Sequence, residues 1–319
     1  MERLPNRMSR IQLLELMLYR AVAGTGAAEL ACKLGVHRST IYRDIEVLSA
    51  VGVPVWQEGG RFGVRCERYL PALRLDLHEA LCVYQATRLL LAQSDRHNPH
   101  AVAALGKLAG VMPEPMETHM TRTAQIFRNR RSHEQYVRAL ETLTRAWAEG
   151  RGVLVRYRSA RASEARERRF DPYFIEPSGV GHACHVIGRD HLHNEVRIFK
   201  VERIEEAQLT DEHYEIPSRF DPHQYLSTAW GIMGGGAAIE VRLRFSPEIT
   251  WRVQESVWHP SQELQYLPDG GCILTVQVSH WKEMKPWIRS WGAQCEVLEP
   301  EELRAQIGEE AGRIALLYQ

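Results

Sequence analysis

One short basic segment carries side chains suited to binding nucleic acid. The residues with hydrogen-bond donors in it are Arg38, Ser39, Thr40, Tyr42 and Arg43. A helix from about His37 to Ala50 would turn Ile41 and Ile45 inward and leave those donors on its exposed face. Guanidinium and hydroxyl groups on one helical face suit the phosphates and base edges of a DNA major groove. This helix is therefore the first candidate for DNA recognition.

The residues around this helix have the spacing of a helix-turn-helix. Ala31 is small where two helices would cross, Gly35 tolerates the positive φ of a tight turn, and Ile41 is a β-branched core residue. A preceding helix over 9–19 and a hairpin over 55–64 complete a winged helix-turn-helix in residues 1–70. Similar spacings occur in helical hairpins that never bind DNA, so the prediction depends on the whole set together with the basic face.

The predicted hairpin adds three arginines, Arg61, Arg65 and Arg68. We expect Arg61 to contact backbone phosphate beside the groove. The alternative is a wing that only covers the helices with Trp56 and Phe62, and both roles can hold at once.

A second basic region lies in residues 151–203, which hold 11 basic and 7 acidic side chains; residues 1–70 hold 10 and 7. A single-strand binder needs cations along the backbone and flat side chains for the bases. The candidates for an effector site are Tyr173, His182, His185, Arg189, Arg197, Lys200 and Arg203. On a strand over 196–204, Arg197 and Arg203 would share one face and Lys200 the other. The alternative is a solvated barrel surface with Phe199 in the core.

Metal binding and catalysis find little support. The group His182, Cys184, His185, His191 and His193 has no standard zinc spacing, and the six cysteines form no CxxC pair. No glycine-rich phosphate loop, HExxH or GxSxG is present. We therefore expect no metal, no cofactor and no enzymatic activity.

Length and composition indicate a globular protein of several domains. The chain has 319 residues, with 44% hydrophobic and 25% charged residues. Its 40 basic and 40 acidic side chains argue against coating nucleic acid along the whole length. No apolar run is long enough to span a membrane, so we expect a cytoplasmic protein without a membrane partner.

The pattern of predicted elements divides the rest of the chain. Helices over 77–93, 100–109, 116–130 and 133–149 form a helical linker and dimerisation region in residues 71–150. A solvated helical face is the more common role for a set of arginines such as the one in this region, and contact with DNA or with a partner subunit is the alternative. The set consists of Arg122, Arg128, Arg130, Arg131 and Arg138. Strands over 153–157, 183–188 and 196–204 suggest a small barrel in residues 151–233.

The last part of the chain has a different order of elements. The tract from Gly234 to Ala238 has the composition of a domain linker. Residues 234–319 then follow a βαββαβ order, which is ferredoxin-like. The fold class is thus α+β with several domains.

The sequence resembles the WYL-domain transcription regulators. The segment 36–55 looks like their winged helix-turn-helix; residues 170–173, 176–177, 187–190 and 195–204 are similar to the WYL core; and residues 258–262 and 286–292 look like the C-terminal extension called WCX. Where the family has Trp-Tyr-Leu, this chain has Cys184-His185-Val186. Strand alternation places His185 on the opposite face from its neighbours, where imidazole can stack on a base or donate to phosphate.

The resemblance implies an Sm-like β-barrel for the WYL domain, a homodimer, and nucleic acid as the ligand sensed by that barrel. It leads us to expect an activator that responds to DNA damage, in which single-stranded DNA raises affinity for a pseudo-palindromic duplex operator. RNA polymerase is a further expected partner. The alternative keeps the DNA-binding half and takes a small molecule or nucleotide as effector, held by the same Arg and His side chains.

Overall fold

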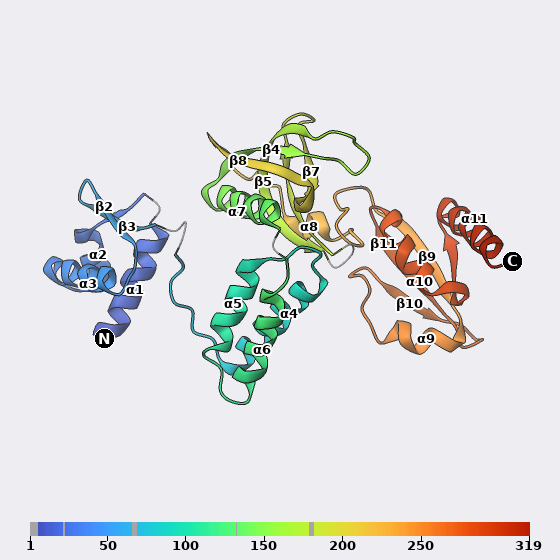
Figure 1. Cartoon of the computed structure of the whole chain (residues 1–319), viewed down its shortest axis with the longest axis horizontal. Coiled ribbons are helices and arrows are strands. Elements are labelled where there is room, and N and C mark those ends of the chain that lie inside the picture. Colours follow the sequence, from blue (N-terminus) through green and yellow to red (C-terminus); the bar gives the residue numbers. More distant parts are fainter. Residues whose placement is uncertain (1–5, 22, 66–68, 132, 179–181) are drawn as a thin grey trace. The chain divides into compact units, whose positions relative to one another are not determined.

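The structure, a computed structural model, describes residues 6–21, 23–65, 69–131, 133–178 and 182–319. The chain divides into two compact units, Met1–Leu81 and Cys82–Gln319 (Figure 1). Each is described by itself. In the described residues no helix is both long and apolar enough to cross a membrane.

The first unit consists of three helices and a three-stranded antiparallel sheet. Its elements are α1 (Arg7–Arg20), β1 (Thr25–Gly26), α2 (Ala27–Leu34), α3 (Arg38–Ala50), β2 (Val55–Glu58) and β3 (Arg61–Val64). Strand β3 lies between β1 and β2. Leu14, Leu30, Ile41 and Phe62 bring all three helices and β3 into one core. This is the winged helix-turn-helix that the sequence predicts.

Two glycine turns set the shape of this unit. Gly35 ends α2 with a φ of 63°, a left-handed conformation that costs little only for glycine. Gly59 and Gly60, with φ of 55° and 75°, form the two-residue turn between Glu58 and Arg61. Both turns lie where the sequence predicts them.

The linker helices are α4 (Leu77–Gln93), which starts in the last residues of the first unit, and α5 (Pro99–Ala109), α6 (Met116–Arg128) and α7 (Glu134–Glu149) in the second. Asn98 caps α5 by accepting from the backbone of His100. Arg130 donates to the carbonyl of Leu91 at 2.9 Å and lies over the Phe127 ring. This arginine of the linker therefore packs within the unit.

An antiparallel five-stranded sheet follows. Its strands are β4 (Arg151–Tyr157), β5 (Arg166–Ser178), β6 (Ala183–Asp190), β7 (Glu195–Lys200) and β8 (Ile204–His213), in the order β7-β6-β5-β4-β8. The sequence analysis missed β5, because Pro172 and Pro177 interrupt its pattern. A register shift between Pro172 and Phe174 accommodates the first of them, as a bulge does.

The two edge strands of this sheet are joined by only three residues, the 3-10 turn η1 (Val201–Arg203). In a flat sheet β7 and β8 would lie about 19 Å apart, whereas the four steps from Lys200 to Ile204 span at most about 14 Å. The sheet must therefore curl so that its edges approach each other. The single strand predicted over 196–204 is wrong, because η1 divides that segment into the ends of two strands.

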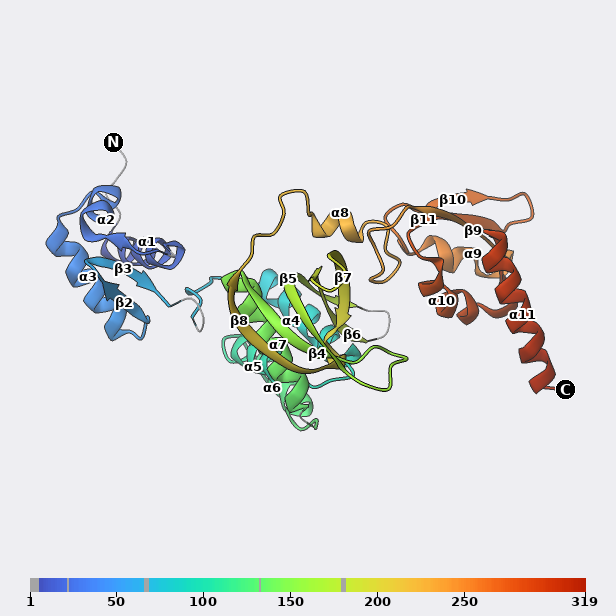
Figure 2. The same ribbon diagram turned by 90° about the horizontal axis from the view of Figure 1, so that it is seen from above.

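Helix α7 packs across β8, β5 and β4 (Figure 2). Its buried face, with Ala139 and Leu143, meets Val153, Phe170 and Val186 in one core. The rings of Phe170 and Phe199 stack at 4.7 Å.

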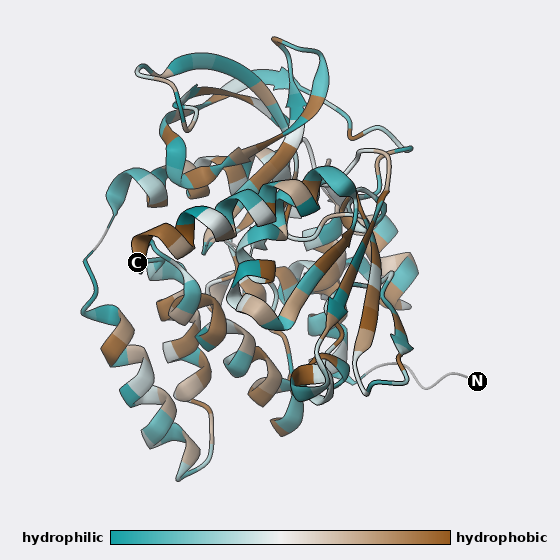
Figure 3. Cartoon of the chain, turned by 90° about the vertical axis from the view of Figure 1, so that its right-hand side faces the viewer, coloured by the Kyte–Doolittle hydropathy of each residue, from teal (hydrophilic) through white to brown (hydrophobic). Residues whose placement is uncertain are grey.

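The C-terminal part begins with α8 (Pro222–Leu226). It continues with β9 (Ile239–Phe245), α9 (Pro247–Gln254), β10 (Glu263–Tyr266), β11 (Cys272–Val278), α10 (Lys285–Ser290), β12 (Cys295–Glu299) and α11 (Glu301–Leu317). The antiparallel order β10-β11-β9-β12 matches the ferredoxin-like prediction. Hydrophobic and hydrophilic residues alternate along these strands (Figure 3), and Leu243, Phe245 and Leu274 are fully buried.

The glycine tract before β9 is more ordered than a linker composition suggests. Gly235, with a φ of 77°, donates from its backbone to the carbonyl of Tyr225 at 3.0 Å. A Cβ on Gly234 would lie 2.0 Å from that carbonyl oxygen. These glycines permit close packing on Tyr225, so the tract is not a loose spacer.

We expect Gly188→Ala to destabilise the second unit. A Cβ there would lie 2.0 Å from the carbonyl oxygen of Asp171 and 2.8 Å from the Phe170 ring, so β5 and β6 must separate. The cost is about 1–3 kcal/mol of unfolding free energy, typical of overpacking, measured by urea denaturation. Gly308→Ala is the control, because open space surrounds that position on α11. Equal stability of the Gly188 variant and the wild type would contradict this packing.

Candidate nucleic-acid interfaces

Helix α3 presents the predicted recognition residues on one outward face. Arg38, Ser39, Tyr42 and Arg43 are exposed and Thr40 is half-buried, while Ile41, Asp44, Ile45 and Leu48 are buried. The structure thus brings the five predicted side chains of α3 together. Their contact with DNA stays a prediction.

The start of α3 is fixed by a histidine. His37 is the N-cap residue, and its Nδ1 accepts from the backbone of Ser39 at 3.4 Å and lies 2.9 Å from the Ser39 hydroxyl. Imidazole therefore replaces the usual serine or threonine cap. Part of the hydrogen-bonding capacity of Ser39 is used here.

An ion pair with a buried carboxylate joins α3 to α1, and the sequence analysis missed it. Arg10 on α1 donates through Nε and Nη2 to the two carboxylate oxygens of Asp44, at 2.7 and 3.3 Å. Asp44 is only 1% exposed. A carboxylate inside the apolar stripe of α3 is the signal that could have revealed it, because such a group needs a buried partner.

The wing has a clear structural role. Arg61 donates to the carbonyls of Ala23 and Gly24 through Nε and Nη2. Trp56 lies against Gly24 and Gly63, where a Cβ would approach its ring to 2.5 Å. Arg61 thus fastens β3 to the turn before α2, and its phosphate contact stays a prediction. Arg65 is exposed, and Arg68 lies outside the described residues.

In the second unit three of the seven predicted effector residues come together. His185 on β6 pairs across the sheet with Lys200 on β7, and the positive charges of Lys200 and Arg203 both act on the His185 ring. Burial and these two cations lower the pKa of His185 to about 4, so its imidazole is neutral at pH 7. Its Nδ1 is buried and has no hydrogen-bond partner among the described residues. His185 also faces away from Val186, which lies in the core, as strand alternation predicts.

Two more of the seven predicted effector residues, Tyr173 and Arg189, contact other side chains of the second unit. Tyr173 is 5% exposed, and its ring packs against Tyr214 and Phe220. Arg189 donates through Nε and Nη2 to Asn194 Oδ1, at 3.0 and 2.7 Å. A buried tyrosine offers no open stacking surface, so we no longer assign Tyr173 to base stacking.

The remaining two predicted residues, Arg197 and His182, lie apart from His185, Lys200 and Arg203. Arg197 is in register with Gly188, on the same side of β7 as the core residue Phe199, near the carboxylates of Asp190 and Glu195. The expectation that Arg197 and Arg203 share a strand face is therefore wrong, because Arg203 belongs to η1. His182, with a φ of 51°, contacts the Gln93 carbonyl at the end of α4.

Two of the histidines considered as metal ligands, His191 and His193, have carboxylate partners. His191 Nε2 lies 2.8 Å from Asp171 Oδ2, and His193 Nδ1 lies 2.7 Å from Asp190 Oδ2. Within the described ranges no three His, Cys, Asp or Glu side chains are grouped so as to hold a metal ion.

Much of the positive charge lies on a hairpin that the sequence analysis did not single out. Residues 151–169, the β4–β5 hairpin, hold 7 basic and 2 acidic side chains, whereas residues 170–203 hold 4 and 5. Counting charges in shorter windows would have found it. Arg156 and Arg158 pair with Glu205, and Arg169 pairs with Glu212. Arg161 and Arg166 are exposed.

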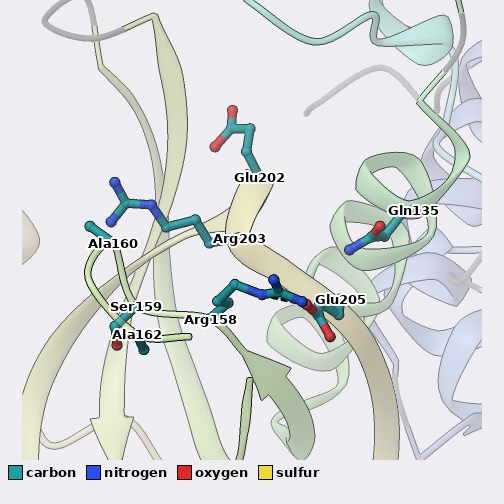
Figure 4. A pocket seen from close by; sticks show the side chains of 8 residues that line it. All are labelled: Gln135, Arg158, Ser159, Ala160, Ala162, Glu202, Arg203 and Glu205. Atoms are coloured by element: carbon teal, nitrogen blue, oxygen red, sulfur yellow. Dashed lines mark hydrogen bonds and ion pairs between the residues drawn. The ribbon is translucent and has the colours of Figure 1, made fainter. Parts of the chain in front are cut away.

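A cavity of about 320 Å³ opens between this hairpin, η1 and the start of α7 (Figure 4). It is lined by Gln135, Arg158, Ser159, Ala160, Ala162, Glu202, Arg203 and Glu205. Gln135 donates to the Ile204 carbonyl at 2.9 Å, and Glu202 accepts from the Cys184 backbone at 2.9 Å. Burial raises the pKa of Glu202, whose Oε2 is buried and unpartnered among the described residues. The lining is polar and charged.

Comparison with known proteins identifies three domains. Family models match residues 10–65 as an HTH domain, residues 138–209 as a WYL domain and residues 237–315 as a WCX domain. These domains, in this order, define a DNA-binding transcription regulator. The chain belongs to the WYL-domain transcription regulators.

Two solved structures show distant likeness. One is proteasome accessory factor B/C (PafBC) of Arthrobacter aurescens, at 18% identity and a TM-score of 0.33, covering 94% of this chain and 47% of that chain. The other is a CRISPR Cas-related protein, at 8% identity and a TM-score of 0.44, covering 79% and 88%. This chain thus spans about half the length of PafBC. At these scores neither structure adds to the domain assignments.

The lowered pKa of His185 predicts a pH dependence of stability. The unfolded side chain binds a proton near pH 6.5, whereas the folded one does so only near pH 4. Protons therefore favour unfolding in this range, and the stability present above pH 6.5 is lost as the pH falls toward 4. We expect His185→Gln to show a smaller drop in Tm between pH 7.5 and 5 than the wild type. His119→Gln, at an exposed position, should keep the wild-type drop, and an unchanged drop in the His185 variant would contradict the assignment.

Proposed function

We propose that this regulator acts as a homodimer, reads a duplex operator with α3, and binds single-stranded DNA at its WYL domain, with strand binding raising operator affinity. Two winged helices would contact two half-sites of a pseudo-palindromic operator, since one alone offers little area for specific binding. RNA polymerase would be the partner of the DNA-bound form.

The exposed face of α3 supports the first part. Its arginines and hydroxyl groups project from a helix that the Arg10–Asp44 pair and the apolar core hold in one orientation. A rigidly held helix that presents donors suits readout of base edges.

The group of His185, Lys200 and Arg203 is the observation that carries the second part. It lies where the sheet curls closed, beside the arginine-rich β4–β5 hairpin. The half-buried imidazole of His185 is neutral at pH 7 and offers a flat ring to a base, while the neighbouring cations attract the backbone. These are the two requirements of a single-strand site.

The physiological meaning follows from the ligand. Single-stranded DNA accumulates when damaged duplex DNA is processed, so a regulator with this effector would report damage. In this scheme the regulator would activate its targets through its contact with RNA polymerase.

A second candidate effector is a single nucleotide. A cavity of about 320 Å³ lies at the lower end of the range for small-molecule sites, and its lining of Arg, Gln and Glu side chains suits a polar ligand. Strand length distinguishes the candidates, because affinity for a strand site rises over several nucleotides and depends steeply on salt.

We expect Tyr42→Ala and Arg43→Ala each to weaken operator binding by more than about 1 kcal/mol without loss of folding, because both side chains are exposed on α3. Fluorescence anisotropy on the cognate site measures the loss. Lys107→Ala, which removes an exposed charge from α5, is the control. Unchanged affinity in both α3 variants would show that α3 is not the recognition helix.

We expect a labelled single strand of about twelve nucleotides to bind the full-length protein more tightly than duplex DNA of the same sequence does. Lys200→Ala should weaken this binding several-fold, whereas Arg197→Ala should not, because Arg197 lies on the opposite face of β7. The strand should raise operator affinity by the same factor by which operator raises strand affinity. Equal weak binding by wild type and the Lys200 variant, or no change in operator affinity, would favour the nucleotide effector.

A further inference from the structure

The cavity beside η1 contains an arginine, Arg158, that shares its carboxylate partner with a second arginine. Arg158 donates to Glu205 Oε1 through Nη2 and, at 2.7 Å, through Nε, and the Nε of Arg156 forms an ion pair with the other oxygen, Oε2, at 3.1 Å. Glu205 thus has two guanidinium partners. If Arg158 turned to a ligand in the cavity, Glu205 would keep Arg156 and would not be left an unpaired charge.

A second arginine of the cavity, Arg203, can bind a ligand without giving up an existing partner. Arg203 extends from η1 toward Ala160 (Figure 4). Among the hydrogen bonds and ion pairs of the described residues, none involves its guanidinium group. The backbone of Arg158 donates to the Arg203 carbonyl at 3.1 Å, so these arginines leave adjacent strand ends. Ser159, in the same lining, adds a hydroxyl group at the turn that Ala162 closes by donating to its carbonyl.

The lining also holds two carboxylates. Glu205 keeps Arg156 as an ion-pair partner when Arg158 turns away, although Arg156 also lies 3.9 Å from Glu206. Burial raises the pKa of Glu202, which favours its uncharged form. The cavity is thus lined by two guanidinium groups and a hydroxyl group, against one paired carboxylate and one whose ionisation burial disfavours.

This set of donors favours a dianion over a monoanion. A phosphate monoester carries about −1.5 to −2 charges at pH 7 and three strong acceptor oxygens, and arginine binds such oxygens in bidentate pairs. A phosphodiester inside a strand carries one charge and continues on both sides. A cavity of about 320 Å³ accommodates a small ligand of roughly nucleotide size, not several nucleotides of a continuous strand.

We propose that this cavity binds a terminal phosphate monoester, held by Arg158, Arg203 and Ser159, with Arg158 exchanging Glu205 for the phosphate. Where the ligand is a single strand, the proposal rests on the proposed function, and the site is selective for phosphorylated strand ends. Arg203 lines the cavity, and its positive charge also lowers the pKa of His185. The nucleotides next to the terminal phosphate would therefore lie along His185 and Lys200.

The test compares strand ends in the full-length protein. An internally labelled thymidine strand of about twelve nucleotides is prepared with a 5′-phosphate, with a 3′-phosphate, and with hydroxyl groups at both ends. We expect one of the phosphates to tighten binding at least about tenfold over the hydroxyl strand. In Arg158→Ala and Arg203→Ala this ratio should fall toward one. Arg161→Ala, on the same turn but outside the lining, should lower all three affinities alike and keep the ratio.

The outcomes separate the two proposals. Equal wild-type affinity for all three strands would overturn the phosphate site and leave the single-strand effector intact. If no strand binds, the proposed effector is wrong. Calorimetric titration with thymidine monophosphate then tests the phosphate site in the cavity. Binding of the monophosphate but not of thymidine, lost in Arg158→Ala, would support the site; no binding would overturn it. Thermal melting of each variant checks that it folds.

Discussion

The second unit depends on one constraint, the three-residue connection between the edges of its sheet. Because η1 is too short to span a flat five-stranded sheet, β7 and β8 must approach each other, and the sheet closes over the core of Phe170 and Phe199. The same turn projects Glu202 and Arg203 from the closing edge. Side chains from β6, from β7 and from the β4–β5 hairpin meet there only because the sheet curls.

The distribution of acids explains why the basic hairpin is not a uniformly positive surface. Strand β8 lies beside β4 and carries Glu205, Glu206 and Glu212, which pair with arginines of the hairpin. Exposed ion pairs of this kind contribute little to stability and are screened by salt. Their effect is to restrict strong anion binding to places where an arginine has no acid partner or shares one. Arg203 and Arg158 meet those two conditions.

Local signals predicted most of the fold. Helical periodicity gave α1 to α7 to within a few residues, and Gly35 and the Gly59-Gly60 pair marked turns that only glycine adopts readily. Strand β5 was not predicted because two prolines interrupt its alternating pattern. In the structure a bulge after Pro172 accommodates the first of them. The face of Arg203 was mispredicted for a related reason: parity arguments fail wherever a short turn divides an apolar run, and η1 leaves little trace in the sequence.

The candidate sites divide along the same line. The face of α3 was predictable because its members are neighbours on one helix. The cavity was not, because Gln135, Arg158 and Arg203 come from three distant segments, and nothing in the sequence shows that Arg156 and Arg158 share Glu205. Charge counts pointed to the WYL domain, but burial distinguishes among the predicted residues: Tyr173 packs in an aromatic cluster, whereas His185 is half-buried, with an Nδ1 that has no partner among the described residues.

For an effector to change operator affinity, it must favour one arrangement of the chain over another. Besides its packing on α7, the WYL domain contacts the linker at the end of α4: the carbonyl of His182 accepts from Asp95 at 3.2 Å, and the His182 ring contacts Gln93, the last residue of α4. Arg130 holds the same end of α4 through the Leu91 carbonyl. The other end of α4 lies at the boundary of the DNA-binding unit. In the proposed scheme, a ligand on β6 and η1 would act on α4 through the contacts that His182 makes with its end.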